Sequence, residues 1–258
     1  MFLYSQLLRS ILTRTYLLSC LAMVSCYAQS TETPTVANNA TLIEYTAHYT
    51  VYRKGDKYGK AVRTLSRTDD ALYKLTFKTE ASKYFYVINT QESSEFTYDA
   101  QQVKPLKYIS SDERTFKETK HQMIEFDYAA EVVLGEDIAQ KWSLPLTPNI
   151  FDPLLVIEKM RNEIGNQRQN LEYFVYDEGS VKTYSFEFLG REKIKTTMGT
   201  VDTIKVSRVK KNSSRKTHFW LSTEHHFIPF RVEQEKDGKE VATLEIEKLT
   251  LPTASSNR

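Results

Sequence analysis

The stretch that decides the fold is residues 43–51, with the sequence IEYTAHYTV. Apolar or aromatic side chains alternate here with polar ones, and this period of two indicates a strand with one buried and one exposed face. The turn cluster KGDK at 54–57 follows, and it leads into a second extended run near 60–68. Together the two runs predict an antiparallel hairpin.

The same alternation recurs along most of the chain. We expect further strands at 73–77, 84–88, 95–98, 104–110, 115–120, 123–128, 171–176, 184–188, 201–209, 217–221, 231–235 and 241–249. Pro105 favours an edge strand or a bulge, because proline donates no hydrogen bond to a neighbouring strand. Turns rather than helices separate most of these runs, so the order of elements indicates a meander.

One segment departs from this pattern and predicts a helix at residues 152–164. Asp152 can accept hydrogen bonds from the first-turn amides, Pro153 suits the first helical position, and Gly165 suits a left-handed cap. Apolar side chains recur on one stripe, at Leu154, Ile157, Met160 or Arg161, and Ile164. We expect this stripe to face the sheet, with Glu158, Lys159 and Asn162 turned away.

The predicted fold class follows from these elements. We expect a mainly β domain over residues 42–252, built from a curved, largely antiparallel sheet that forms an open or partly closed barrel or roll. One principal α-helix, near residues 152–164, packs on that sheet. Residues 29–41 and 253–258 are polar and poor in core-forming side chains, which predicts a disordered linker and a disordered tail.

The N-terminal segment has the order and composition of a secretory signal peptide. Arg9 and Arg14 precede the apolar run YLLSCLAMV at 16–24, which is about half of the roughly 20 residues that a membrane-spanning helix needs. We predict a signal peptide over 1–28, cleavage between Ala28 and Gln29, and release as a soluble periplasmic protein. Lipidation at Cys26, which would anchor the chain to a membrane, is the alternative. We expect no transmembrane span in the mature chain.

Charge and cysteine content exclude several classes of protein. Lys plus Arg exceed Asp plus Glu by two over the whole chain, and Arg9 and Arg14 account for that excess. The rest of the chain is therefore neutral, which argues against a nucleic-acid binder and against a broadly polybasic membrane surface. Net charge does not exclude a local basic patch. Cys20 and Cys26 lie in or beside the signal segment, so the folded part has no thiol for a disulfide, a nucleophile or a thiolate zinc site.

Catalytic and metal-binding motifs are weak. The cluster of His218, Glu224, His225 and His226 could hold a metal, but adjacent histidines on a strand point to opposite faces. We interpret it as a polar connection and expect no metal and no cofactor. The sequence has no GxSxG elbow and no glycine-rich phosphate loop, and we expect no catalytic residues and no enzymatic activity. An enzyme of unrecognised type would need a polar cleft with converging carboxylates.

Binding residues are harder to place. Tyr84, Tyr86 and Trp220 join a large apolar body to a polar tip and could line an apolar pocket, although they could equally be core residues. With Arg231, they are our candidates for ligand binding. The basic loop at 210–216 could touch anionic lipid or an acidic partner, or it could be a solvated hairpin tip.

Several short motifs together point to a family. They are FDY at 126–128, DPLL at 152–155, GRE at 190–192, MGTV at 198–201, WLS at 220–222, IPFRV at 228–232 and DG at 237–238, after turn glycines Gly55 and Gly59. In order and spacing, residues 45–249 resemble domain-of-unknown-function family 3108, a set of exported proteins of Gram-negative bacteria. The resemblance implies a β-rich periplasmic or envelope-associated protein, with no established activity and no catalytic residue to transfer.

Two functional hypotheses follow. The first is a non-enzymatic periplasmic or envelope protein that binds an apolar or amphiphilic ligand and handles lipid or lipoprotein, because an aromatic-rich curved sheet carries no catalytic constellation. The alternative is an envelope assembly factor that binds another protein through a sheet edge or through the basic loop at 210–216. The expected partners are thus a lipid or an envelope protein, and not nucleic acid.

Overall fold

The computed structural model describes residues 42–69, 71–99, 102–165, 171–209 and 213–252. The predicted signal peptide with Ala28, Gln29 and Cys26, the linker at 29–41 and the tail at 253–258 lie outside the described residues. The same holds for residues 210–212 of the basic loop.

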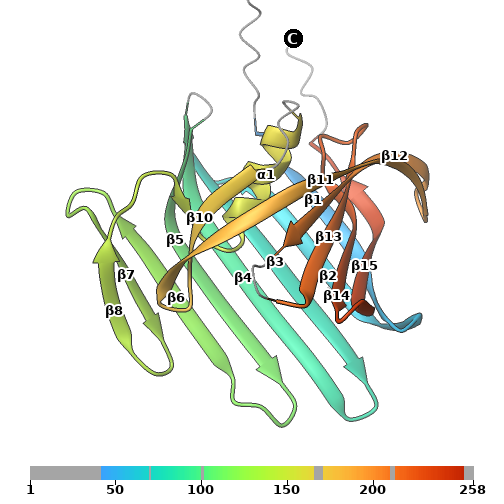
Figure 1. Ribbon diagram of the computed structural model, residues 1–258, viewed down its shortest axis with the longest axis horizontal. Helices are drawn as coiled ribbons and strands as arrows, with labels where there is room; N and C mark the ends of the chain where they lie inside the picture. The colour runs from blue at the N-terminus through green and yellow to red at the C-terminus, as the bar shows by residue number, and fades with distance from the viewer. Residues whose placement is uncertain (1–41, 70, 100–101, 166–170, 210–212, 253–258) are drawn as a thin grey trace, which may run out of the picture. The chain divides into compact units, whose positions relative to one another are not determined.

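Within these residues the chain forms fifteen strands and one α-helix (Figure 1). The first eight strands are β1 (Tyr45–Arg53), β2 (Asp56–Arg67), β3 (Leu72–Lys83), β4 (Tyr86–Asp99), β5 (Gln102–Arg114), β6 (Lys120–Asp127), β7 (Val132–Asp137) and β8 (Lys141–Pro145). The rest of the fold is β9 (Ile150–Phe151), α1 (Leu155–Gly165), β10 (Leu171–Asp177), β11 (Ser180–Thr196), β12 (Gly199–Val209), β13 (Arg215–Ser222), β14 (Pro229–Lys236) and β15 (Lys239–Thr250).

All fifteen strands belong to one sheet, in the order β8-β7-β6-β5-β4-β3-β2-β1-β15-β14-β13-β12-β11-β10-β9. All neighbouring strands in this order except β10 and β9 pair antiparallel, and the two halves of the chain meet where β1 pairs with β15. The short strand β9 pairs parallel to β10. The structure confirms the predicted fold class, because the sheet is a largely antiparallel meander with one helix.

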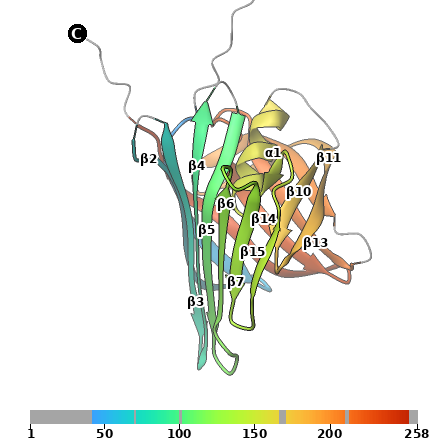
Figure 2. The ribbon, with the colours of Figure 1, turned by 90° about the vertical axis from the view of Figure 1, so that its left-hand side faces the viewer.

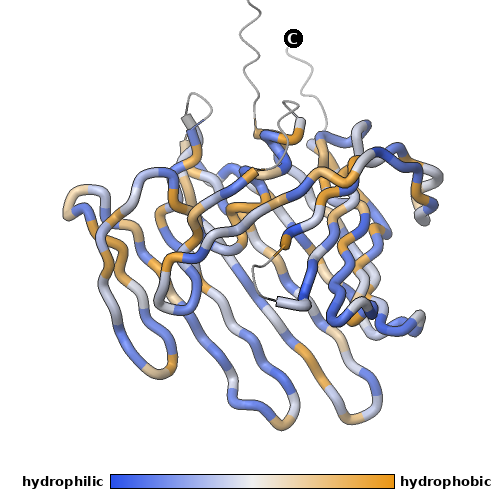
Figure 3. The backbone as a smooth tube through the Cα atoms, in the orientation of Figure 1, coloured by the Kyte–Doolittle hydropathy of each residue, from blue (hydrophilic) through white to orange (hydrophobic). Residues whose placement is uncertain are grey.

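Hydropathy alternates along many of the strands, as expected for a sheet with one interior face (Figure 3). Two expected strands differ from the structure: of the strand expected at 84–88 only residues 86–88 are extended, and of the strand expected at 115–120 only Lys120 is. Tyr84 and Phe85 form the turn between β3 and β4, and residues 115–119 form the connection between β5 and β6. Both segments contain aromatic residues, which favour strands, so the composition of the segments indicates strands although the chain reverses direction there. The strands β7, β8 and β9 carry too weak an alternation to be predicted.

The sheet curves around α1, which lies against its inner face (Figures 1 and 2). Leu155, Val156 and Met160 on the helix are fully buried. Burial extends to most of the helix rather than to one stripe, because strands from both halves of the sheet contact it. The helix therefore fills the interior of the roll at its own level.

Side chains join the two ends of the sheet. Trp142 on β8 stacks on Tyr176 on β10, with ring centroids 5.6 Å apart. The Tyr176 hydroxyl also donates a hydrogen bond to the carbonyl of Pro145 at 3.0 Å. The seam between β8 and β10 is thus closed by packing and by a side-chain hydrogen bond, with no ladder of backbone bonds between these two strands.

Among the described residues, no helix has the length and apolar character that crossing a membrane would require.

Candidate functional site

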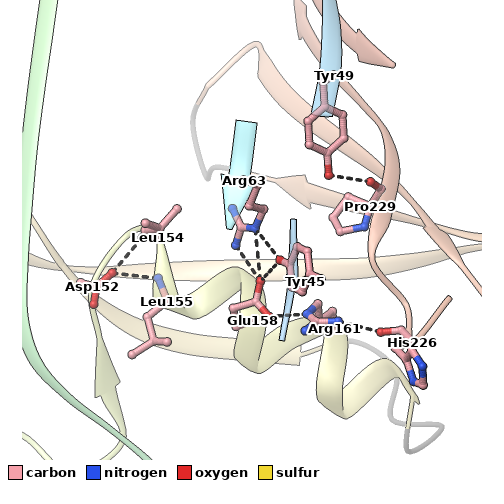
Figure 4. Close-up of polar contacts among 10 residues, drawn as sticks. All are labelled: Tyr45, Tyr49, Arg63, Asp152, Leu154, Leu155, Glu158, Arg161, His226 and Pro229. Carbon is pink, nitrogen blue, oxygen red and sulfur yellow. Dashed lines mark hydrogen bonds and ion pairs between the residues drawn. The ribbon is translucent and has the colours of Figure 1, made fainter. Parts of the chain in front are cut away.

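A buried cluster of charges fixes α1 inside the sheet (Figure 4). Glu158 on α1 accepts hydrogen bonds at Oε1 from Arg63 Nη2 on β2 at 2.9 Å and from the Tyr45 hydroxyl on β1 at 2.7 Å. Its other oxygen, Oε2, pairs with Nε of Arg161, one helical turn further on. Arg161 also donates to the carbonyl of His226 at 2.7 Å. One carboxylate therefore links the helix to β1 and β2, and through Arg161 to the loop between β13 and β14.

The cluster is almost completely withdrawn from solvent. The side chain of Glu158 is 1% exposed, that of Arg63 7% and that of Arg161 4%. Burial disfavours the charged carboxylate, but the guanidinium groups of Arg161 and Arg63 outweigh it and hold the pKa of Glu158 at about 2. The prediction that Glu158 turns away from the sheet is therefore wrong. Its charge is tolerated inside because two cations and a hydroxyl satisfy it.

A second buried carboxyl, Asp152, begins the helix. Its Oδ1 accepts the amides of Leu154 and Leu155 at 2.9 and 2.8 Å, which is the predicted capping role. Its Oδ2 accepts the hydroxyl of Ser94 on β4 at 2.6 Å. Burial raises the pKa of Asp152 to about 6, although these hydrogen bonds favour the charged form. The helix thus begins on a carboxyl that is costly to ionise.

Beyond the level of α1, towards the turn at Tyr84 and Phe85, most side chains on the inner face of the sheet are half-buried rather than fully buried. Cross-strand pairing places Arg63, Phe77, Glu92, Ser110 and Gln122 side by side across β2 to β6. We call the half-buried part of this surface the lower inner face, and it consists of Phe77, Thr79, Ile88, Thr90, Glu92, Ser110, Asp112, Arg114 and Gln122.

The lower inner face combines apolar and charged groups. Phe77 and Ile88 pack at the margin of the core, and the guanidinium of Arg63 lies 5.9 Å from the centre of the Phe77 ring. The Tyr108 hydroxyl donates to Glu92 Oε1 at 2.7 Å, and burial raises the pKa of Glu92. The side-chain nitrogen of Gln122 is buried without a hydrogen-bond partner among the described residues. This surface can therefore hold a molecule that has both apolar and hydrogen-bonding parts.

A hollow lies at the end of this face. It has a volume of about 280 Å³ and is lined by Asp112, Arg114, Lys117, Glu118, Lys120 and Ile138. In its lining, Asp112 and Arg114 of β5 form an ion pair at 2.7 Å. A second hollow of about 610 Å³ is lined by residues of β2, β3, β4 and β15, among them Lys57, Lys60 and Val87.

The structure separates the four candidate ligand-binding residues. Tyr84 is 92% exposed in the turn between β3 and β4, and Tyr86 follows it at the start of β4. Trp220 and Arg231 are paired on β13 and β14. The indole of Trp220 is buried, donates to Glu192 at 2.6 Å and lies under the amino group of Lys205 at 4.5 Å. These contacts give Trp220 a packing role.

The histidines also do not converge. His218 faces Glu235 at 3.5 Å, and Nδ1 of His225 lies 2.8 Å from the hydroxyl of Ser222. His226 contributes its backbone carbonyl to Arg161. Within the described part of the chain, no group of three or more His, Cys, Asp and Glu side chains is arranged to hold a metal ion.

No sequence pattern indicates that the residues that define the site come together. Arg63 and Glu92 stand in alternating strands, where a charged side chain ordinarily faces solvent. The spacing of Glu158 and Arg161 by three residues indicates an ion pair on one helix face, but not that the pair is buried. Only the approach of β2 to α1 makes these residues one cluster.

Comparison with known proteins agrees with this architecture. The family described as "Protein of unknown function (DUF3108)" matches residues 44–245. No characterised protein with a curated description matches the sequence.

The solved structures that match this chain include the following two. A β-barrel-like protein of the DUF1849 domain family from Brucella abortus aligns with a TM-score of 0.54 and 12% identity, over 82% of this chain and 98% of that chain. At this identity the likeness concerns the fold alone. Immune modulator A from Aeromonas veronii aligns with a TM-score of 0.23 and 10% identity, over 77% of this chain and 74% of that chain.

Proposed function

This chain belongs to the DUF3108 family, and from that premise we propose that it is a non-enzymatic envelope protein that binds an amphiphilic molecule on the lower inner face. The apolar part of the ligand lies on Phe77 and Ile88. Its polar part reaches the charged and hydrogen-bonding groups of β4 to β6. The N-terminal sequence pattern supports export to the envelope, where amphiphilic molecules are abundant.

One observation carries this proposal. The lower inner face holds half-buried apolar side chains next to Glu92 and the unpartnered nitrogen of Gln122, in an interior that α1 fills only at its own level. A buried donor without a partner costs free energy, so it favours occupation by an acceptor. Apolar area beside such donors matches a lipid-like molecule better than a purely apolar or a purely ionic one.

The position of the helix sets the location of the ligand. Leu155, Val156 and Met160 leave no exposed surface at the level of α1, so a ligand has no room there while the helix stays in place. The hollow of about 280 Å³ lined by Asp112 and Arg114 lies at the open end of the lower inner face. We therefore place the entry route at that end, between the β5–β6 and β7–β8 turns.

Native mass spectrometry tests the proposal on protein purified from the envelope of the cells that make it. A co-purifying lipid or other amphiphile is the expected result. Displacement of the fluorescent probe N-phenyl-1-naphthylamine then compares variants. Ile88→Ser removes an inner apolar side chain, and Val87→Ser changes its neighbour on the outer face. We expect Ile88→Ser to weaken probe binding by roughly tenfold, as the loss of one buried aliphatic side chain implies, and Val87→Ser to leave it unchanged. Equal binding by both variants, with no co-purifying amphiphile, would contradict the proposal.

The alternative role as an assembly factor that pairs through a sheet edge has less support. The two edge strands are short, with five residues in β8 and two in β9. Lys141 and Pro145 lie on β8, and both residue types discourage the addition of another strand. The basic loop at 210–216 stays a second possible contact, with Arg215 and Lys216 exposed at the start of β13.

A further inference from the structure

Two neighbouring turns expose large aromatic side chains to solvent. Tyr84 is 92% exposed and Phe85 76% exposed in the β3–β4 turn, and Phe116 is 85% exposed in the β5–β6 turn. We call these three residues the aromatic tip. The two turns project from the end of the sheet that lies away from α1 (Figures 1 and 2). Water-exposed aromatic rings gathered at one place indicate a contact surface, whereas isolated ones are ordinary.

The backbone at the aromatic tip is also unfavourable for these residues. Tyr84 has φ of 56° and Phe116 has φ of 63°, the left-handed region that glycine, asparagine and aspartate tolerate best. An aromatic side chain at such a position gives no stability through burial and adds backbone strain. Neither burial nor backbone conformation therefore explains why aromatic residues occupy these two turns, and a function of the tip accounts for both.

Hydrogen bonds hold the two turns together. The Thr115 hydroxyl accepts the amide of Val87 at 2.8 Å, and the amide of Thr115 donates to the carbonyl of Val87 at 3.0 Å. The rings of Phe85 and Phe116 meet edge to face, with centroids 6.2 Å apart. The aromatic tip is therefore preorganised as one unit from two hairpins.

Cationic side chains flank the aromatic tip. Lys54 stands in the adjacent β1–β2 turn and Lys57 at the start of β2. Between them, Asp56 forms an ion pair with Lys83 at the end of β3, at 2.5 Å. Lys117 follows Phe116. Among the described residues, Lys54, Lys57 and Lys117 have no carboxylate within ion-pair distance, although Glu118 is next to Lys117 in the chain. Their charge is thus available to an external anion.

We propose that the aromatic tip inserts into the headgroup region of an anionic lipid bilayer, with Lys54, Lys57 and Lys117 contacting the headgroups. Aromatic rings partition into this region, and each nearby lysine adds attraction to anionic lipid. A bilayer fits this surface better than a protein partner, because three side chains on projecting turns are far fewer than the residues of a stable protein interface. The inference goes beyond the proposed ligand binding and does not require it.

Vesicle sedimentation tests the inference. The full exported chain is mixed with vesicles of phosphatidylethanolamine and phosphatidylglycerol, or of phosphatidylcholine alone. The tip variant carries Tyr84→Ser, Phe85→Ser and Phe116→Ser. Its control carries Phe174→Ser, Leu189→Ser and Met198→Ser, which remove three apolar side chains that are 49%, 49% and 40% exposed elsewhere in the protein. All forms share one N-terminal segment, so a difference between them reports only the substitutions.

We expect the original chain and the control to bind anionic vesicles. The tip variant should bind these vesicles at least roughly tenfold more weakly. The combined substitutions Lys54→Gln, Lys57→Gln and Lys117→Gln should reduce binding to anionic vesicles and its dependence on salt. Binding to phosphatidylcholine alone should be weaker for every form. Equal vesicle binding by the tip variant and the control would overturn the inference.

A depth measurement separates insertion from loose adsorption. In Phe85→Trp, brominated lipid should quench emission beyond the background from Trp142 and Trp220, whereas Phe174→Trp should show only that background. If the protein binds no vesicles, and a photo-crosslinker at position 85 instead captures one protein in cells, the aromatic tip is a protein contact and the lipid assignment is wrong. Probe binding on the lower inner face should not change in the tip variant, so the two proposals can fail separately.

Discussion

Arg63 on β2 and Glu158 on α1 form an ion pair at 2.9 Å, although they lie 95 residues apart in the chain and are both nearly inaccessible to solvent. Arg161 shares the same carboxylate. Within this cluster, the two buried guanidinium groups therefore share one carboxylate, that of Glu158. The consequences of removing each partner are unequal.

We expect Glu158→Gln to lower the free energy of unfolding by about 3–5 kcal/mol, because two buried cations then lack a counter-charge. Arg63→Met should cost less, since it leaves Glu158 and Arg161 as a neutral pair. Glu95→Gln is the matched control: it breaks the Lys74–Glu95 pair, also at 2.9 Å but 40% and 39% exposed. That change should cost about 0–1 kcal/mol. Urea unfolding measures all three, and a loss for Glu158→Gln no larger than for Glu95→Gln would refute the structural role of the cluster.

The buried carboxyl of Asp152 predicts a pH dependence of stability. Its pKa rises from 3.8 to about 6 on folding, so the folded state holds this proton more tightly than the unfolded state does. The resulting stabilisation is fully present below about pH 4 and is lost as the pH rises through about 6. Asparagine caps helices as well as aspartate and carries no charge. Relative to the original chain, Asp152→Asn should therefore gain about 2–3 kcal/mol in stability between pH 4 and pH 7.

Urea unfolding of both proteins across that range measures the difference for Asp152→Asn directly, because the other titrating groups are common to both. Ser94→Ala serves as a second probe. It removes a hydrogen bond that favours the charged form of Asp152, so the loss of stability should move to higher pH. A constant difference between Asp152→Asn and the original chain would show that Asp152 is solvated.

The aromatic tip predicts a gain of stability on substitution. Tyr84→Asn and Phe116→Asn place a residue that tolerates positive φ at the two strained positions. Each change should raise the free energy of unfolding by about 0.5–1 kcal/mol. The same changes should weaken binding to anionic vesicles. A purely structural role for the rings predicts the opposite sign in the unfolding experiment.

Gly55 in the β1–β2 turn and Gly59 within β2 should differ in their sensitivity to substitution. A Cβ at Gly59 would lie 2.0 Å from the carbonyl oxygen of Glu80 and 2.5 Å from Cα of Ala81, which are backbone atoms of the adjacent strand. Gly59→Ala should therefore destabilise the protein by about 3 kcal/mol or disturb the β2–β3 register. Gly55 has φ of 79° but open space around it, so Gly55→Ala should cost only about 1 kcal/mol. Thermal unfolding distinguishes these outcomes, and equal losses would contradict the close approach at Gly59.

The sequence predicts those strands and the helix that are marked by side-chain alternation or by capping residues within a few positions of one another. Residues 43–51 alternate because one face of β1 is buried, and the Asp152-Pro153 start with Gly165 at the end marks α1. The strands at the far end of the meander were missed, since β7 and β8 have short and uneven alternation. Tyr84, Phe85 and Phe116 were assigned to strands because aromatic residues favour strands, and no composition rule separates a strand aromatic from one held in a turn.

By itself, the sequence determined the fold class, the place of the helix and the family, because side-chain periodicity, capping residues and motif order are properties of neighbouring residues. Tertiary structure alone decided that β1 pairs with β15, that Arg63 meets Glu158, and that Phe85 meets Phe116 across two turns. These relationships join residues far apart in the chain. Their free energy depends on burial and on the distance between charges or rings, which exist only once the sheet has closed around α1.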